Sequence, residues 1–231
     1  NINLHINKGE FVFIVGSSGS GKSTLMKLLL KELDPTEGDI IINKVKTNEL
    51  NRRQIPYLRR NLGVVFQDFR LLPNKTVYEN VAFAMRVIEA PGRIIRRNVP
   101  AVLSLVGLGQ KGRSYPNQLS GGEQQRIALA RAILKDAPIV VLDEATAFAD
   151  PENEHQIQKA FETLTRNKTV LMIAHRLSTV QNADNIIVLN EGKIAEQGSH
   201  SALLEKNGVY AAMWADYQRS AQWKVRKEAA V

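Results

Sequence analysis

Apolar residues along the chain form two patterns, short unbroken runs and longer stretches with helical spacing. The unbroken runs have strand length, and their consecutive apolar residues are typical of strands buried on both faces. They are FVFIV at 11–15, IVVLD at 139–143, TVLMIA at 169–174 and NIIVLN at 185–190. Helical spacing occurs between them, as in STLMKLLLKEL at 23–33 and HQIQKAFETL at 155–164. Strands that alternate with helices predict a mostly parallel sheet with helices on both faces.

Weaker patterns predict three further strands. Ile2, Leu4 and Ile6 alternate with polar residues, as the residues of a half-buried strand do. The runs DIIIN at 39–43 and LGVVFQ at 62–67 are apolar and of strand length. The predicted fold is therefore α/β, with a mostly parallel sheet flanked by helices and an antiparallel β portion.

One long stretch interrupts this alternation. From residue 68 to residue 134 the pattern is helical only, which predicts an inserted α-helical subdomain. Residues 1–67 and 135–231 then form the core around it. We expect a single domain built from these two parts.

A glycine-rich segment between the first buried strand and the first helix carries the clearest chemistry. Its residues fit the pattern G-x-x-x-x-G-K-[ST], in the strand–loop–helix context that the motif requires. They are Gly16, Ser17, Ser18, Gly19, Ser20, Gly21, Lys22 and Ser23, and Thr24 follows directly. Backbone amides and the helix start would hold phosphates, Lys22 would reach the outer phosphates, and the Ser23 hydroxyl would bind Mg²⁺. The fold is then expected to be of the P-loop NTPase type.

Polar residues follow other predicted strands at the same edge of the sheet. Asp143 and Glu144 end the run PIVVLDE, where Asp143 would face Mg²⁺ and Glu144 the attacking water. Gln67 and His175 also follow apolar runs and could reach the metal, the water or the terminal phosphate. Taken singly, each of these side chains could instead be an ordinary surface residue with no role in the site. His5, His155 and His200 are interpreted as structural.

The stretch LSGGEQQR at 119–126 begins another helix. Ser120 and Glu123 have the spacing of a capping box. Capping does not explain Gly121 and Gly122, because each glycine in a helix costs about 1 kcal/mol relative to alanine. Bare amides beside the Ser120 hydroxyl instead predict a second anion site.

Composition bounds these interpretations without deciding between them. The 231 residues are 44% hydrophobic and contain no cysteine, which excludes disulfides and a thiolate metal site. No apolar run is long enough to cross a bilayer. The net charge of +8 would suit nucleic acid, anionic lipid or a phosphorylated ligand, although a solvated basic surface is the simpler interpretation. The same alternatives apply to the arginines at 52, 53, 59, 60, 86, 93, 96 and 97.

Taken in order, these motifs resemble the nucleotide-binding domains of ABC transporter ATPases over essentially the whole chain. The resemblance implies that residues 16–24 are the Walker A loop and that Asp143 and Glu144 are the Walker B pair. It implies that Ser120, Gly121, Gly122 and Glu123 are the signature. Gln67 is then the Q-loop residue, also facing the metal, and Asp150 and His175 are the D-loop and switch residues.

The resemblance also implies cofactors and partners. ATP and Mg²⁺ would bind between two such domains packed head to tail, with the signature of one closing over ATP on the Walker A loop of the other. Closure and hydrolysis would drive an integral membrane permease or an FtsX-like protein through the helical subdomain. The chain would then lie on the cytoplasmic face of the cell membrane, held there by its partner.

Two branches of the family are visible in one chain. Residues 1–134 resemble the FtsE-type cell-division ATPase, whereas residues 135–231 resemble ATPase domains of ABC exporters. Ala145 and Arg176 stand where the first branch has proline and aspartate. We interpret the chain as a mosaic joined near Leu134 and Lys135.

Two further departures from the family bear on function. The D-loop reads Ala147, Phe148, Ala149, Asp150 in place of the commoner S-A-L-D, which weakens the expected signalling across the dimer. No aromatic residue precedes Phe11. We therefore expect adenine stacking to be missing, ATP binding to be weak, and the chain to be a fragment.

Two other functions compete with an ATPase that moves a membrane partner. A nucleic-acid ATPase of the same superfamily would carry a long coiled coil before the signature, but only 97 residues separate Lys22 from Ser120. A module that binds nucleotide without hydrolysis would not need Glu144. Nucleic acid is thus an unlikely partner.

Overall fold

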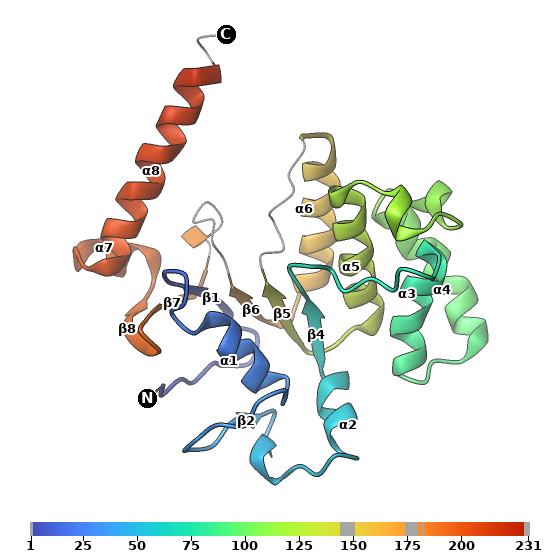
Figure 1. The fold of residues 1–231 in the computed structure, drawn as a ribbon, viewed down its shortest axis with the longest axis horizontal. Helices are drawn as coiled ribbons and strands as arrows, with labels where there is room; N and C mark the ends of the chain where they lie inside the picture. Colours follow the sequence, from blue (N-terminus) through green and yellow to red (C-terminus); the bar gives the residue numbers. More distant parts are fainter. Residues whose placement is uncertain (1, 144–150, 174–179, 182, 229–231) are drawn as a thin grey trace.

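The computed structural model describes residues 2–143, 151–173, 180–181 and 183–228. Beyond residue 143, the side chains described are those of 155–173, 180–181 and 183–219. A six-stranded sheet in the order β4-β5-β6-β1-β7-β8 forms its centre (Figure 1). The strands are β1 (Phe11–Val15), β4 (Leu62–Val65), β5 (Ile139–Asp143), β6 (Thr169–Ile173), β7 (Asn185–Asn190) and β8 (Lys193–Gly198). A separate antiparallel pair joins β2 (Ile41–Ile42) to β3 (Val45–Lys46).

Strand direction within the sheet confirms the predicted architecture. The pairs β4 with β5, β5 with β6, β6 with β1 and β1 with β7 are all parallel. Among the described strands of this sheet, β8 alone, on the edge beyond β7, runs antiparallel. The carboxyl ends of five strands therefore meet at one edge, which is the edge where ligands bind in open α/β sheets.

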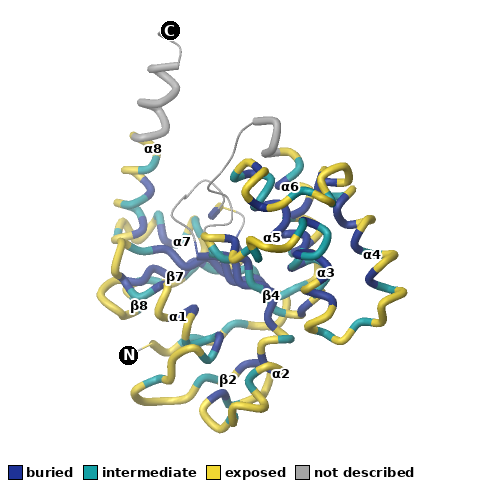
Figure 2. Tube along the Cα trace, turned by 45° about the vertical axis from the view of Figure 1, so that its right-hand side comes forward, coloured by how far each residue is buried: buried dark blue, intermediate teal, exposed yellow. Residues whose placement is uncertain are grey.

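Helices cover both faces of the sheet, and neighbouring side chains of β1 show why. Phe13 and Val15 join the core under α3 to α6, whereas Val12 and Ile14 join a second core under α1 and α2. All four side chains are fully buried, as the unbroken apolar run predicts. Figure 2 shows the buried colour concentrated in the central strands of the sheet. The helices are α1 (Lys22–Leu29), α2 (Ile55–Arg60), α3 (Val77–Val87), α4 (Gly92–Leu105), α5 (Gly121–Lys135), α6 (Pro151–Thr165), α7 (His200–Glu205) and α8 (Val209–Glu228). Short 3₁₀ turns occupy Thr47–Glu49, Gly109–Lys111 and Pro116–Gln118.

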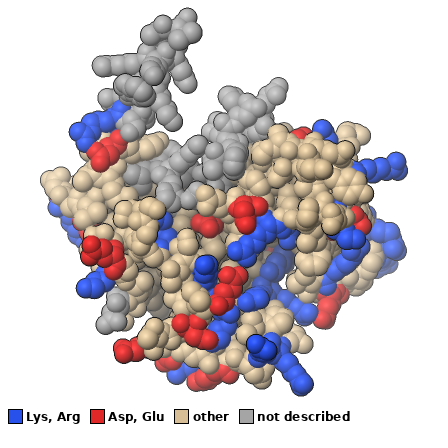
Figure 3. All heavy atoms as spheres, in the orientation of Figure 1, with Lys and Arg blue, Asp and Glu red and all other residues tan. Residues whose placement is uncertain are grey.

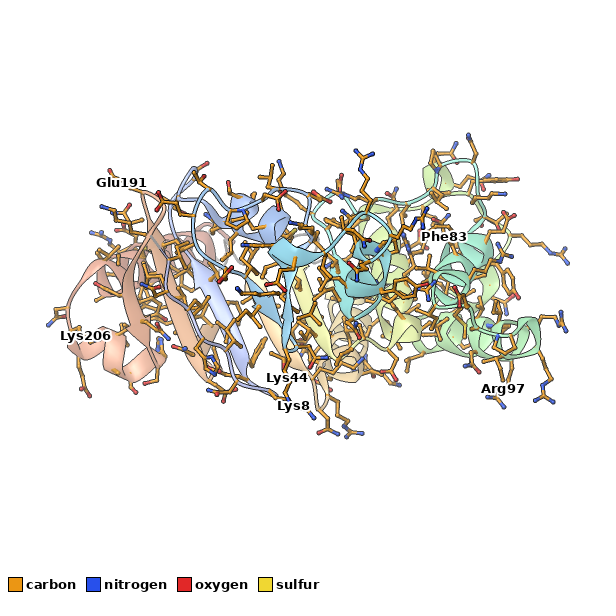
Figure 4. The ribbon with its side chains drawn as sticks, turned by 90° about the horizontal axis from the view of Figure 1, so that it is seen from below. Lys8, Lys44, Phe83, Arg97, Glu191 and Lys206 are labelled. Carbon is orange, nitrogen blue, oxygen red and sulfur yellow. The ribbon has the colours of Figure 1, made fainter. Side chains whose placement is uncertain are left out.

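Between β4 and β5 the described chain is helical, as the sequence predicts. The helices α3 and α4 pack beside α5 at one end of the sheet (Figure 1). On α4, Ile95 and Val99 are buried while Arg96 and Arg97 are exposed, so one face of the helix is solvated. Arg97 points away from the body of the molecule (Figure 4). The division of the chain at residues 67 and 135 remains a prediction.

The predicted strand at the start of the chain is wrong. Residues 2–7 form no strand in the structure, although Leu4 and Ile6 pack against the second core. Alternation of apolar residues fixes which side chains face a core, but a strand also needs a neighbour for its backbone groups. The run at 39–43 is likewise shortened to the two residues Ile41 and Ile42.

At the other end of the chain, α7 and α8 pack against β8. His200 Nδ1 lies 2.6 Å from the hydroxyl of the fully buried Tyr210, so the described structure supports a structural role for His200. The helix α8 then projects from the body (Figure 1). No helix in the described ranges combines the length and the apolar character needed to cross a membrane.

Helix α3 begins with a capping box that gives a testable pH dependence. Thr76 Oγ1 accepts a hydrogen bond from Glu79 N at 3.2 Å, and the Glu79 carboxylate accepts one from Thr76 N at 2.8 Å. The second bond lowers the pKa of Glu79 below its ordinary 4.5. A lowered folded-state pKa adds stability above pH 4.5 that is lost as the pH falls through the folded pKa.

We therefore expect Glu79→Ala to lower the free energy of unfolding at pH 7 and to have less effect in acid. Denaturant unfolding of wild type and variant at pH 7 and at progressively lower pH measures this difference. Glu37→Ala, at an exposed position, is the control. A difference that stays constant across the pH range would contradict the assignment.

Candidate functional site

The glycine-rich loop follows β1 and leads directly into α1, as predicted. Gly19 and Gly21 have φ of +79° and +104°, which only glycine adopts readily. Gly16 lies against the neighbouring strand β7. A Cβ there would collide with the Leu189 carbonyl oxygen and lie 2.6 Å from Ser20 Oγ. The loop thus needs glycine at these positions for its backbone shape.

Lys22 lies inside this loop. Its side chain is buried, and its ammonium group donates to the carbonyl oxygens of Gly16 and Ser17 at 2.8 Å each. Ser20 Oγ lies 3.4 Å from the same nitrogen. A cation is therefore fixed at the concave side of a loop whose next residues, Ser23 and Thr24, are exposed in the first turn of α1.

The turn between β7 and β8 supports the loop from the side. Gly192 N donates to the Ser20 carbonyl oxygen at 3.1 Å. Glu191 and Gly192 have φ of +47° and +73°, which make a tight turn. Figure 4 labels Glu191 at this turn. The loop backbone is thus held both by β7 and by the turn that follows it.

Asp143 and Gln67 lie at the same edge of the sheet as the loop, at or just after the carboxyl end of a strand. Asp143 ends β5 and is in register with Ile173, the last residue of β6. Gln67 is exposed, but β4 ends at Val65, so Gln67 belongs to the turn after the strand and not to its end. Glu144, Asp150 and His175 lie outside the described residues, and their roles stay predictions.

The second glycine pair has the predicted capping box. Ser120 Oγ accepts from Glu123 N at 3.2 Å, and Glu123 Oε2 accepts from Ser120 N at 2.9 Å. Gly121 and Gly122 form the first turn of α5. Helix α5 packs in the core on one face of the sheet, whereas α1 packs on the other. The two predicted anion sites of one chain thus begin helices on opposite faces.

The amides, the hydroxyl and the carboxylate at this site fit a nucleoside triphosphate with Mg²⁺. Glycines leave the loop amides unobstructed, and a Cβ on Gly16 could not be accommodated. A hydroxyl from Ser23 and a carboxylate from Asp143 are the oxygen ligands that Mg²⁺ prefers. The residues present therefore suit both groups.

The comparison with family models matches residues 1–147 to the ABC transporter family. The chain belongs to the ABC transporter family. Its members with similar sequences include the cell division ATP-binding protein FtsE of Bacillus subtilis, 43% identical over 86% of this chain and 91% of that protein. The ATP-dependent lipid A-core flippase of Cupriavidus metallidurans is 45% identical over 92% of this chain but 36% of that protein.

These two relatives confirm the resemblance to both the cell-division and the exporter branches. Each alignment runs over most of the chain, so the join near Leu134 and Lys135 stays a prediction. An uninterrupted single-branch sequence across that point in the source gene would contradict it.

Solved structures of ABC proteins confirm the fold. A dimeric ATP-binding cassette in a post-hydrolysis state, bound to ADP and phosphate, has a TM-score of 0.78 at 35% identity, over 86% of this chain and 89% of that one. A bacterial Atm1-family exporter with ATP bound has a TM-score of 0.80 at 37% identity, over 91% of this chain and 37% of that one. The chain is an ABC-type ATPase, and the comparisons give no support to a nucleic-acid function.

One feature near the site was missed by sequence reasoning. A groove of about 290 Å³ lies between α3 and the α1–α2 side of the core. Most of its lining residues are apolar, and its basic residues are Arg59, Arg70, Arg131 and Lys135. Figure 3 shows basic side chains gathered across the middle of this face. The i, i+4 spacing of Arg131 and Lys135 on α5 was the available signal.

Lys135 joins two parts of the core at the end of this groove. Its ammonium group donates to the carbonyl oxygens of Arg59 and Leu62 at 2.7 and 2.6 Å. Burial, with the nearby charge of Arg131, lowers the pKa of Lys135 to about 8. The end of α5 is thereby tied to the start of β4.

Proposed function

We propose that this ABC ATPase is the motor subunit of a membrane complex and works as a head-to-tail pair. The observation that carries the proposal is that the phosphate loop and the signature begin helices packed on opposite faces of the sheet. In the proposed arrangement, each is therefore completed by the matching part of a second copy. A two-fold pair would bring each loop to the signature of its partner.

Each site residue has a role in this proposal. The loop residues 16–24 bind the phosphates, with Lys22 reaching the outer ones, and Ser120 to Glu123 close over the nucleotide from the second copy. Ser23, Asp143 and Gln67 hold Mg²⁺, which would neutralise phosphate charge when bound. Glu144 orients and deprotonates the attacking water, His175 contacts the terminal phosphate, and Asp150 contacts the second copy.

The groove is the feature that favours a membrane partner. It lies between the helical subdomain and the core, beside the turn that carries Gln67. Phe83 on α3 is 40% exposed and lines it (Figure 4). A permease or FtsX-like protein that inserts a segment here would hold the ATPase on the cytoplasmic face of the membrane and would receive its motion.

Complementation between two inactive variants tests the head-to-tail arrangement. Lys22→Ala should disable the phosphate loop, and Gly122→Asp should place a charge and a side chain in the signature. Each variant alone should have lost Mg²⁺-dependent ATP turnover. Mixing them should restore a measurable fraction, since one site of the mixed dimer joins an intact loop to an intact signature.

A mixture of Lys22→Ala with Ser23→Ala is the matched control, because both changes affect the phosphate loop. It should recover nothing. Lack of recovery in the Lys22→Ala and Gly122→Asp mixture, with mixed dimers present by native mass measurement, would rule out the proposed pairing.

A further inference from the structure

The turn after Gln67 has an unfavourable backbone. Phe69 and Arg70 have φ of +57° and +43°, both in the left-handed region. Residues with a Cβ rarely occupy this region, and two in succession are more unusual still. Neither residue is glycine or asparagine, so the surrounding structure must hold the turn in place.

Arg131 on α5 supplies the contact that holds it. Its guanidinium donates to the Arg70 carbonyl oxygen at 2.8 Å and approaches the Phe69 carbonyl oxygen at 3.5 Å. Arginine suits this task because its planar head presents several donors in fixed directions. These bonds link residues more than 60 positions apart in the sequence, so they join two separate elements.

Two further contacts fix the turn against the core. The Arg70 guanidinium lies over the Phe66 ring, 3.6 Å from its centre, and 3.5 Å from the Glu32 carboxylate. Phe69 is buried. The backbone on both sides of Gln67 is therefore positioned by packing below it and by Arg131 beside it.

We propose that Arg131 is a positioning residue for ATP hydrolysis, which holds the turn that carries Gln67 and couples it to the signature helix. This inference rests on the proposed role of Gln67. Arg131 lies on α5, whose first turn is Gly121 and Gly122, so movement of the signature is transmitted to the turn through one rigid helix. The groove is lined by Phe69, Arg70 and Arg131, so a segment seated there touches the same contact.

Arg131→Met tests the proposal while keeping the aliphatic part of the side chain. We expect kcat for Mg²⁺-ATP to fall roughly tenfold to hundredfold, because displacing a positioned group by about 1 Å can cost that much. KM for ATP should change little, since the phosphate loop is not touched. Arg93→Met, at an exposed position on α4, is the matched control and should be fully active. Unchanged kcat in Arg131→Met would overturn the proposal. A lower melting temperature together with loss of both kcat and ATP binding would also overturn it, because Arg131 would then have a structural role only.

A rescue experiment separates positioning from general damage. Arg70→Gly and Arg70→Ala both remove the contacts to Phe66 and Glu32, but only glycine adopts the left-handed backbone without strain. In the Arg131→Met background, glycine at position 70 should restore kcat by several-fold relative to alanine. Equal kcat in the two double variants would overturn the proposal.

Gln67→Ala distinguishes failure of this inference from failure of the function on which it rests. If Gln67→Ala lowers kcat and Arg131→Met does not, the coupling through Arg131 is wrong. If Gln67→Ala leaves kcat unchanged, the assigned role of Gln67 is wrong, and Arg131 has nothing to position.

Discussion

Replacing Glu144 with glutamine should abolish steady-state ATP turnover while ATP binding is retained. A general base contributes about 10²- to 10⁴-fold to the rate, and glutamine keeps the size of the side chain but cannot accept the proton. Because hydrolysis would be the step that reopens the pair, the variant should accumulate as an ATP-bound dimer. Phosphate release and size measurement with and without Mg²⁺-ATP test both expectations.

Glu205→Gln makes the same chemical change at an exposed position on α7 and should leave turnover unchanged. An active Glu144→Gln protein would remove Glu144 from the role of base. If the variant is inactive but stays monomeric with ATP bound, the assignment of Glu144 as the base stands. The proposed link between hydrolysis and reopening is then contradicted.

Gly16→Ala should eliminate nucleotide binding and lower stability. The added methyl group would collide with the Leu189 carbonyl oxygen and crowd Ser20 Oγ, so either β7 or the loop must move. Overpacking of this kind costs about 1–3 kcal/mol of folding stability. The displaced carbonyl oxygen of Gly16 also holds Lys22, so the cation would leave its position in the loop. Nucleotide titration and thermal unfolding measure the two effects.

Gly63→Ala is the matched control, because its added methyl group would meet Ala137 Cβ at 3.5 Å, an ordinary contact distance. It should bind nucleotide normally. Normal nucleotide binding by Gly16→Ala would show that the loop tolerates a side chain at this point, contrary to the geometry.

Much of the fold followed from local patterns that have one physical interpretation. The run at 11–15 has no polar residue, and a strand of that kind must be covered on both faces, as β1 is. The capping box at Ser120 and Glu123 was predicted because both partners lie within one turn of the chain. The strand at residues 2–6 was predicted wrongly, because pairing depends on a neighbour that alternation does not specify.

The candidate site was predicted where it depends on backbone shape and missed where it depends on distant contacts. Glycines marked the phosphate loop, because only glycine permits that geometry. No such marker exists at Phe69 and Arg70, whose left-handed backbone is imposed from α5. Arg131 could not be linked to that turn from the sequence, since the contact spans a large separation along the chain.

If each site is completed by a second copy, as proposed, the rate depends on how often two chains meet. In that arrangement a single chain in dilute solution would carry two incomplete sites, and turnover per chain should rise with protein concentration until pairing is saturated. A membrane partner that binds two copies would replace bulk concentration by a local one, on the order of millimolar for short flexible tethers. Assembly on the membrane would then switch on hydrolysis without any change within a single chain.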